Sequence, residues 1–152
     1  MSTLATFGIC LATLIVARLF DVALPEQSNL MLVRESLLSA FRDWSHFIVA
    51  LKIAAMVLVV APVFEELVFR GLLYRLPSRW LPHWLPMILS SVLFSAAHYL
   101  AQPFPDNAFV ALAFFGMAQC WLYRRSGRIW CAMLNHLLFN LTTLLLVFYP
   151  NL

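Results

Sequence analysis

Charged side chains are scarce in this chain, and that scarcity decides its class. Only 11% of the 152 residues are Asp, Glu, Lys or Arg, and 63% are hydrophobic, whereas a soluble domain carries about 25% charged residues. The composition therefore excludes an ordinary soluble domain. Because each crossing of the hydrocarbon core needs about 20 apolar residues, the length allows about five or six membrane spans and no sizeable soluble part.

Several chemistries are excluded because their motifs are missing. The three cysteines, Cys10, Cys120 and Cys131, lie in apolar runs without C-x-x-C spacing, and we interpret them as small buried hydrophobic residues. The chain has no H-E-x-x-H zinc motif, no G-x-S-x-G serine elbow and no mid-span aspartates for a dyad protease. A basic groove with interleaved aromatic residues is also absent, so no nucleic-acid partner is expected.

The apolar runs predict an all-α, polytopic membrane bundle of about five transmembrane helices plus one interfacial helix. The expected spans are residues 3–20, 46–64 continuing as helix to about 76, 87–101, 107–123 and 129–148. The first run lacks the positively charged start of a signal peptide, so we expect a retained span.

Two local patterns add detail to this architecture. Residues 29–44 carry apolar side chains at helical spacing with charges between them, which is typical of a helix on the membrane surface. Pro62 removes a backbone N–H inside the second span, so it should kink or restart that helix. We treat residues 1–152 as a single integral-membrane domain.

The arginines predict the orientation of the bundle. The connections at 75–86 and 124–128 carry Arg75, Arg79, Arg124, Arg125 and Arg128, whereas the connection at 102–107 carries only an aspartate. By the positive-inside rule the first two connections are cytoplasmic.

Polar residues inside the expected spans are few. A mid-membrane ionisable residue costs at least about 2.5 kcal/mol on insertion scales, so it usually faces the bundle interior and has a function. The set comprises Lys52, Glu65, Glu66, Arg70, Ser90, Ser91, Ser95, His98, Gln119, Asn135, His136, Asn140, Thr142 and Thr143. The serines and threonines are interpreted as close-packing residues.

Four of these residues are expected at a similar depth. At about 1.5 Å per residue, each lies roughly 12–18 Å from the predicted cytoplasmic end of its helix, near the middle of a core about 30 Å thick. They are Glu65, His98, His136 and Asn140. Since they come from three helices, they are expected to form one shared site.

Helical spacing separates the two adjacent glutamates. Positions four apart share a face, whereas neighbours point about 100° apart, so Glu66 is expected to pair with Arg70. Glu65 is then the freer carboxylate and the candidate general base. A purely structural role, in which an ion pair and hydrogen bonds lock the helices together, remains open.

Three ordered motifs resemble a known family. The segments "EELVFR" (Glu65, Glu66, Arg70), "FSAAH" (Phe94, His98) and "HLLFN" (His136, Asn140) match E-E-x-x-x-R, F-x-x-x-H and H-x-x-x-N. Their order and separation over residues 60–142 resemble the type II CAAX prenyl endopeptidases, also called the CPBP or abortive-infection family of intramembrane proteases. A protease core at about 46–148 would then follow an added span and surface helix at 1–45.

The resemblance implies a role for each motif residue. Glu65 would activate the hydrolytic water, with His98 holding or polarising it. His136 and Asn140 would donate to the oxyanion of the tetrahedral intermediate. Glu66 and Arg70 would position Glu65, with Phe94 as a supporting residue.

Metal content stays open at this point. Glu65, His98 and His136 could form a His₂Glu zinc site with an open position for water. On the resemblance alone we favour the metal-free glutamate mechanism, so no cofactor is expected.

The sequence as a whole predicts an intramembrane endopeptidase in a bacterial inner membrane. Its substrate would be a membrane-associated protein or peptide cut near its C-terminus, such as a prenylated protein, a bacteriocin leader or a protein with a C-terminal sorting tag. Two other classes remain open: a non-catalytic membrane partner or chaperone that retains the motifs, and a small transporter or proton relay.

Overall fold

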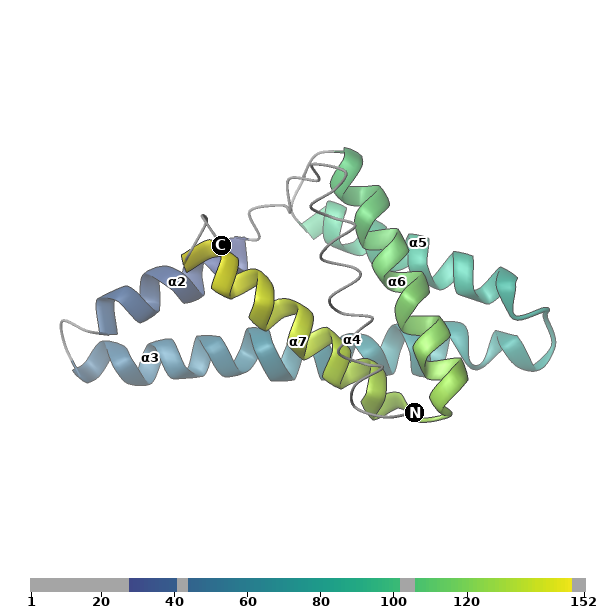
Figure 1. Ribbon diagram of the computed structural model, residues 1–152, viewed down its shortest axis with the longest axis horizontal. Helices are drawn as coiled ribbons and strands as arrows, with labels where there is room; N and C mark the ends of the chain where they lie inside the picture. Colours follow the sequence, from purple (N-terminus) through teal and green to yellow (C-terminus); the bar gives the residue numbers. More distant parts are fainter. Residues whose placement is uncertain (1–27, 41–43, 102–105, 149–152) are drawn as a thin grey trace.

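The described part of the chain is helical apart from short turns. The computed structural model describes residues 28–40, 44–101 and 106–148. Its main helices are α2 (Ser28–Ala40), α3 (Trp44–Ala55), α5 (Trp84–Ala101), α6 (Asp106–Ser126) and α7 (Ile129–Phe148), and no strand occurs among the described residues (Figure 1). The predicted all-α class is confirmed. The predicted first span, residues 3–20, lies outside the described residues.

One long helix runs the length of the molecule and organises the others. After α3 the chain continues through a π-helical stretch η1 (Met56–Val60), α4 (Ala61–Glu66) and a second π-helical stretch η2 (Leu67–Tyr74) without leaving helical geometry. It ends in a short 3₁₀ turn, η3 (Pro77–Arg79). Figure 1 shows this helix lying horizontally, with α7 crossing it near α4.

Pro62 explains the change of hydrogen-bond pattern before α4. The N–H of Ala61 bonds to the carbonyl of Met56, five residues back. In that register the carbonyl of Val57 faces the nitrogen of Pro62, which carries no proton. The side-chain nitrogen of Asn140 on α7 donates to this carbonyl over 3.2 Å. Pro62 therefore restarts the α-helical pattern, as predicted. The carbonyl of Val57, which Pro62 leaves without a backbone donor, is satisfied by a neighbouring helix.

Helices α5 and α6 approach each other closely because small residues line their contact. Ser95 Oγ donates to the Phe109 carbonyl over 2.6 Å. A Cβ placed on Gly116 would lie only 3.0 Å from both Cα and Cβ of Ser91. Ser90 Oγ reaches the carbonyl of Phe69 on the long helix, also over 2.6 Å. These contacts let α5 and α6 pack tightly beside η2.

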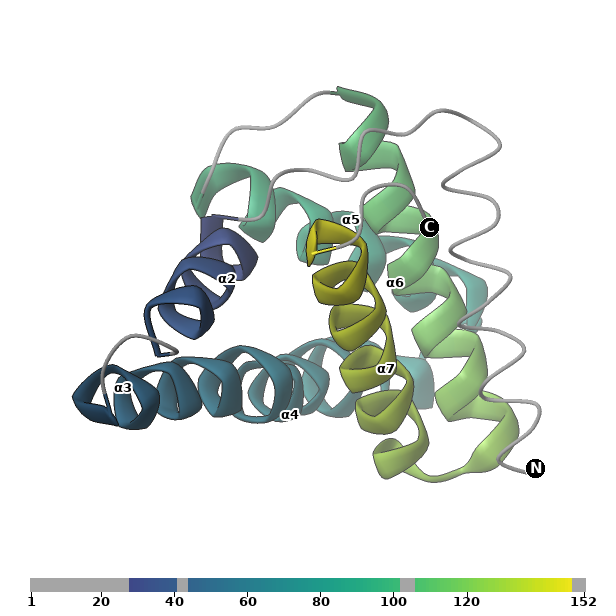
Figure 2. The same ribbon diagram turned by 60° about the vertical axis from the view of Figure 1, so that its left-hand side comes forward.

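Helix α2 packs beside α3 and against the end of α7 (Figure 2). Val33 and Leu144 are buried there, with Leu37, Ile53 and Val57 packed around them. The helix expected at the membrane surface thus has one face buried against protein, and its position relative to the bilayer stays a prediction.

The outer surface is apolar, as a membrane protein requires. His46–Arg79 and Trp84–Ala101 are long and apolar enough to cross a membrane, with mean hydropathies of 2.6 and 1.4, and Ile129–Leu145 is apolar but shorter. Only 11% of the apolar window in His46–Arg79 is buried, whereas a core helix of a soluble protein would be largely covered. Side chains such as Phe64 and Leu100 are 67% and 83% exposed. These faces match a lipid environment.

Replacing Gly116 with alanine is expected to destabilise the bundle. The new Cβ would press on the backbone of Ser91, and overpacking of this kind costs about 1–3 kcal/mol. Thermal unfolding of the purified protein in detergent measures the effect. Gly71→Ala is the matched control, because its Cβ would meet the Ile129 side chain at 3.4 Å and the Glu66 carbonyl at 4.0 Å, which are ordinary contacts. Equal unfolding temperatures for the two variants would contradict the close α5–α6 contact.

Candidate active site

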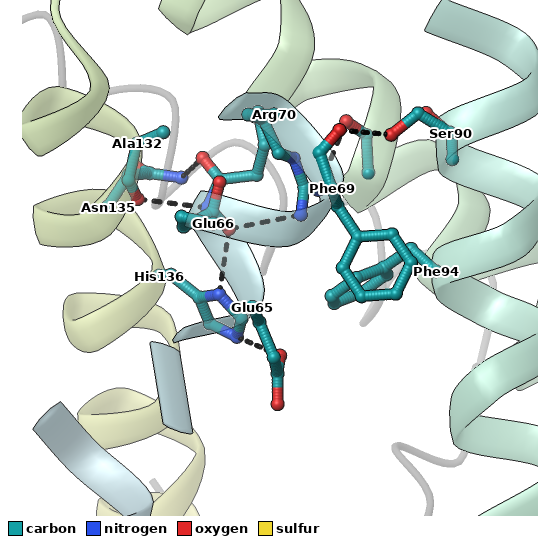
Figure 3. Close-up of polar contacts among 12 residues, drawn as sticks. Glu65, Glu66, Phe69, Arg70, Ser90, Phe94, Ala132, Asn135 and His136 are labelled. Carbon is teal, nitrogen blue, oxygen red and sulfur yellow. Dashed lines mark hydrogen bonds and ion pairs between the residues drawn. The ribbon is translucent and has the colours of Figure 1, made fainter. Parts of the chain in front are cut away.

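The buried carboxylate of Glu66 is the centre of the polar cluster. Its Oε1 forms an ion pair with Nη1 of Arg70 at 3.1 Å, and both side chains are fully buried. Nδ1 of His136 lies 2.9 Å from the same oxygen, and Nε2 of Gln119 donates to it over 3.3 Å. Figure 3 shows Arg70 from the long helix and His136 from α7 converging on Glu66. The predicted Glu66–Arg70 pair is confirmed.

Arg70 holds its buried charge between the long helix, α5 and α6. Its Nη2 donates to the carbonyl of Gly116 over 3.3 Å. Its guanidinium carbon lies 4.7 Å from the ring centroid of Phe94, a cation–π distance. A buried cation needs a counter-charge, and Glu66 supplies it.

Two carboxamides extend this network, and the sequence analysis gave them no role. Asn135 Nδ2 donates to Gln119 Oε1 over 3.0 Å, and Gln119 Nε2 donates to the carbonyl of Ala132 over 3.0 Å as well as to Glu66. Because the Gln119 oxygen is occupied by Asn135, its nitrogen faces the carboxylate. Gln119 therefore joins α6 and α7 to the glutamate pair.

The sequence does contain a feature that could have predicted the role of these carboxamides in helix contacts. A mid-span hydroxyl can be satisfied within its own helix, as Ser91 and Thr143 are by donating to carbonyls four residues back. A Gln or Asn has two donors and an acceptor, so it usually needs partners on another helix. Such residues mark helix contacts even where no motif includes them.

Glu65 lies on the adjacent face of α4 and is the freer carboxylate. Its side chain is 26% exposed, and its Oε2 lies 3.7 Å from His136 Nε2 and 3.9 Å from His98 Nε2. Neither distance is a direct hydrogen bond. Oε2 is buried and has no hydrogen-bond partner among the described residues. The two imidazoles thus face an unsatisfied carboxylate oxygen.

The other nitrogens of the two histidines are already engaged. His98 Nδ1 lies 2.9 Å from the carbonyl of Phe94, and His136 Nδ1 contacts Glu66. Carbonyl and carboxylate oxygens accept, so in each neutral ring Nδ1 carries the proton and Nε2 presents a lone pair. Three acceptor atoms then face one another: Oε2 of Glu65 and Nε2 of His98 and of His136. The space between them suits a water molecule, which has two protons to donate, or a cation.

The residue types around Glu65 also suit zinc, although they do not form a ready site. Nδ1 of each histidine is held by an oxygen, as is usual for histidines that bind a metal through Nε2. Among the residues that the structure describes, however, no group of three or more His, Cys, Asp or Glu side chains is arranged to hold a metal ion.

Aromatic rings close the site on the side of α5 and α6. The centroid of Phe94 lies 4.5 Å from that of His98 and 5.9 Å from that of His136. Phe115 lies 5.1 Å from the His136 ring. The supporting role expected of Phe94 fits this position, because its ring contacts both imidazoles and Arg70.

Asn140 is not part of this convergence. It lies one turn beyond His136 on α7 and donates to the carbonyl of Val57. Within the described residues, no hydrogen bond or ion pair joins Asn140 to Glu65, His98 or His136. The structure thus brings together Glu65, Glu66, His98 and His136, and it gives Asn140 a separate partner on the long helix.

Comparison with known proteins supplies the family. The model of the family described as "Type II CAAX prenyl endopeptidase Rce1-like" matches residues 47–142, a range that contains the two glutamates and both histidines. No curated protein and no solved structure matches the chain. The family match covers more than half of the sequence, and the clustered side chains come from the three motifs on which the resemblance rests. The chain therefore belongs to the type II CAAX prenyl endopeptidase Rce1-like family of intramembrane proteases.

Proposed function

We propose that this protein hydrolyses a peptide bond near the C-terminus of a membrane-associated protein or peptide, with Glu65 activating water and without a metal ion. The observation that carries this function is the unsatisfied Oε2 of Glu65, which lies within 4 Å of Nε2 of both His98 and His136. A water molecule can bridge polar atoms at such separations.

The chemistry follows the usual course of acyl transfer to water. Glu65 accepts one proton as the water oxygen attacks the substrate carbonyl carbon, which gives a tetrahedral intermediate with a negative oxygen. The protonated Glu65 then donates that proton to the leaving amine, and the C–N bond breaks. His98 Nε2 accepts the second water proton as a hydrogen bond and orients the nucleophile.

His136 acts through its contact with Glu66. In the neutral ring Nε2 is an acceptor, so His136 can donate to the oxyanion only when Nε2 is protonated. The Glu66 carboxylate on Nδ1 balances that charge, and Arg70 and Gln119 hold Glu66 in place. Glu66 is thus a positioning residue for His136.

Asn140 is proposed as the second oxyanion donor. Its Nδ2 uses one proton for the Val57 carbonyl, and the other remains for an oxyanion. We place the protein as a multi-pass protein of a bacterial inner membrane, with a site open to the cytoplasmic half, in agreement with the arginine-rich connections.

Glu65→Gln is expected to lower turnover by about 100-fold or more, the usual contribution of a general base. Candidate substrates come from comparing the C-termini of membrane proteins from cells with and without the enzyme, and cleavage of one such peptide by purified protein gives the rate. Glu35→Gln, an exposed glutamate on α2, is the matched control. Unchanged cleavage by folded Glu65→Gln protein would refute the mechanism, and a phenotype that survives this variant would favour a non-catalytic partner.

Asn140→Ala is expected to reduce both stability and turnover. A carbonyl left without a donor away from water costs about 1–3 kcal/mol, and loss of one oxyanion donor lowers kcat by about 100-fold. The double variant Pro62→Ala/Asn140→Ala separates the two effects, because alanine at 62 supplies an N–H for the Val57 carbonyl. We expect its unfolding temperature to recover while cleavage stays low. Recovery of cleavage as well would show that Asn140 acts through structure alone.

Chelators are expected to leave cleavage unchanged. Native mass spectrometry of the active protein should then show no bound zinc, and added zinc should not raise the rate. Loss of activity in chelator, its return with zinc, and loss of zinc from His98→Ala protein would instead establish the zinc-dependent form.

A further inference from the structure

A cavity lies at the end of the long helix, away from the glutamates. It has a volume of about 320 Å³ and is lined by residues of η3, of the connection after it and of the end of α6. Its lining includes three arginines, a histidine and two tyrosines: Arg75, Arg79, Arg124, His83, Tyr74 and Tyr123. The proposed catalytic cycle uses none of them.

Within residues 28–40, 44–101 and 106–148, no ion pair joins an arginine of this cavity to a carboxylate. Asp106 is the only acidic residue that follows Glu66 in the sequence. It stands at the start of α6, whereas Arg124 is near its end, about 27 Å away at 1.5 Å per residue. Glu66 itself is buried against Arg70. In the described part of the chain the cavity is therefore a concentration of positive charge, which suits an external anion.

The walls of the cavity are held in place by local contacts. The rings of Tyr74 and Tyr123 meet edge to face at a centroid distance of 6.1 Å. Ser78 Oγ donates to the Tyr74 carbonyl over 2.7 Å. The turn after α6 is closed by the N–H of Gly127 bonding to the Tyr123 carbonyl over 2.8 Å, and Gly127 has the positive φ of 65° that such a turn requires.

Neighbouring tryptophans place the cavity at the level of lipid headgroups. Trp80 and Trp84 flank His83 and are 74% and 59% exposed. Tryptophan gathers at the membrane–water interface, and arginine-rich connections gather on the cytoplasmic side, where anionic lipids give the leaflet a negative surface. Guanidinium groups bind phosphate through paired hydrogen bonds.

We propose that this cavity binds the phosphate of an anionic phospholipid headgroup from the cytoplasmic leaflet. The guanidiniums of Arg79 and Arg124 take the phosphate oxygens, and the tyrosine pair forms the apolar floor beneath the headgroup. Bound lipid would tie the end of the long helix to the end of α6. This binding is independent of the proposed proteolysis.

The test compares lipid selectivity of the full chain in nanodiscs. Spin-labelled phosphatidylglycerol and phosphatidylcholine are titrated against the wild type, Arg79→Gln/Arg124→Gln and the control Arg125→Gln/Arg128→Gln. Both double variants remove two exposed cations from the same end of the molecule, but Arg125 and Arg128 do not line the cavity. A direct hydrogen bond between charged groups is worth about tenfold or more, so the cavity variant should lose at least about tenfold of its preference for phosphatidylglycerol. The control removes the same surface charge but no direct contact with the phosphate, so its loss should be clearly smaller.

Three outcomes would overturn the inference. Equal losses in both variants would mean a general effect of surface charge, and no preference in the wild type would mean no site. Displacement of the labelled lipid by millimolar inorganic phosphate would assign the cavity to free phosphate. Unfolding temperatures establish that each variant is folded. If the double variant fails that check, the single changes Arg79→Gln and Arg128→Gln make the same comparison.

Discussion

The polar interior depends on one carboxylate oxygen, Oε1 of Glu66. An ion pair from Arg70, Nδ1 of His136 and the amide of Gln119 all reach this atom. In lipid no water can replace a missing partner, so a buried charge requires partners from neighbouring helices. The long helix, α6 and α7 are thereby held at fixed relative positions, and the imidazole of His136 is fixed with them.

This arrangement leaves Glu65 free because its neighbour takes the available donors. Arg70 is one helical turn beyond Glu66, so it cannot also neutralise Glu65, which points about 100° away. Among the described residues, the ion-pair partners of Glu65 are the Nε2 atoms of His98 and His136, and each ring is already anchored through Nδ1. Each of the two adjacent glutamates has a buried Oε2 without a hydrogen-bond partner among the described residues. They differ because Oε1 of Glu66 is held by three side chains and the Glu66 side chain is fully buried, whereas Glu65 is 26% exposed and faces the two imidazoles. Glu65 is therefore the carboxylate that a polar ligand can reach.

Sequence reasoning predicted the parts of this site that depend on helical spacing and depth. The Glu66–Arg70 pair follows from a separation of four residues, and the meeting of His98 and His136 at Glu65 follows from their similar depth. Gln119 could not be placed in this way, since its contact with Glu66 depends on how α6 is rotated against the long helix. The partner of Asn140 could not be predicted either, because it depends on the π-helical register before Pro62.

That register shows how the irregular parts of the long helix prepare the site. Helix α4, which carries both glutamates, lies between two π-helical stretches, η1 and η2. A π-helical stretch fits more residues into a turn than an α-helix, so it shifts the direction in which later side chains point. With α4 in its observed phase, Glu66 is buried at 0% exposure and Phe64 faces outward at 67%. A regular α-helix with the same sequence would rotate α4 relative to α3 and η2. Either Glu66 would then turn towards lipid or Phe64 would turn away from it. Pro62 removes one backbone hydrogen bond of the long helix, and the hydrogen bond from Asn140 replaces it. Together they allow the π-helical stretch that sets the directions in which Glu65 and Glu66 point.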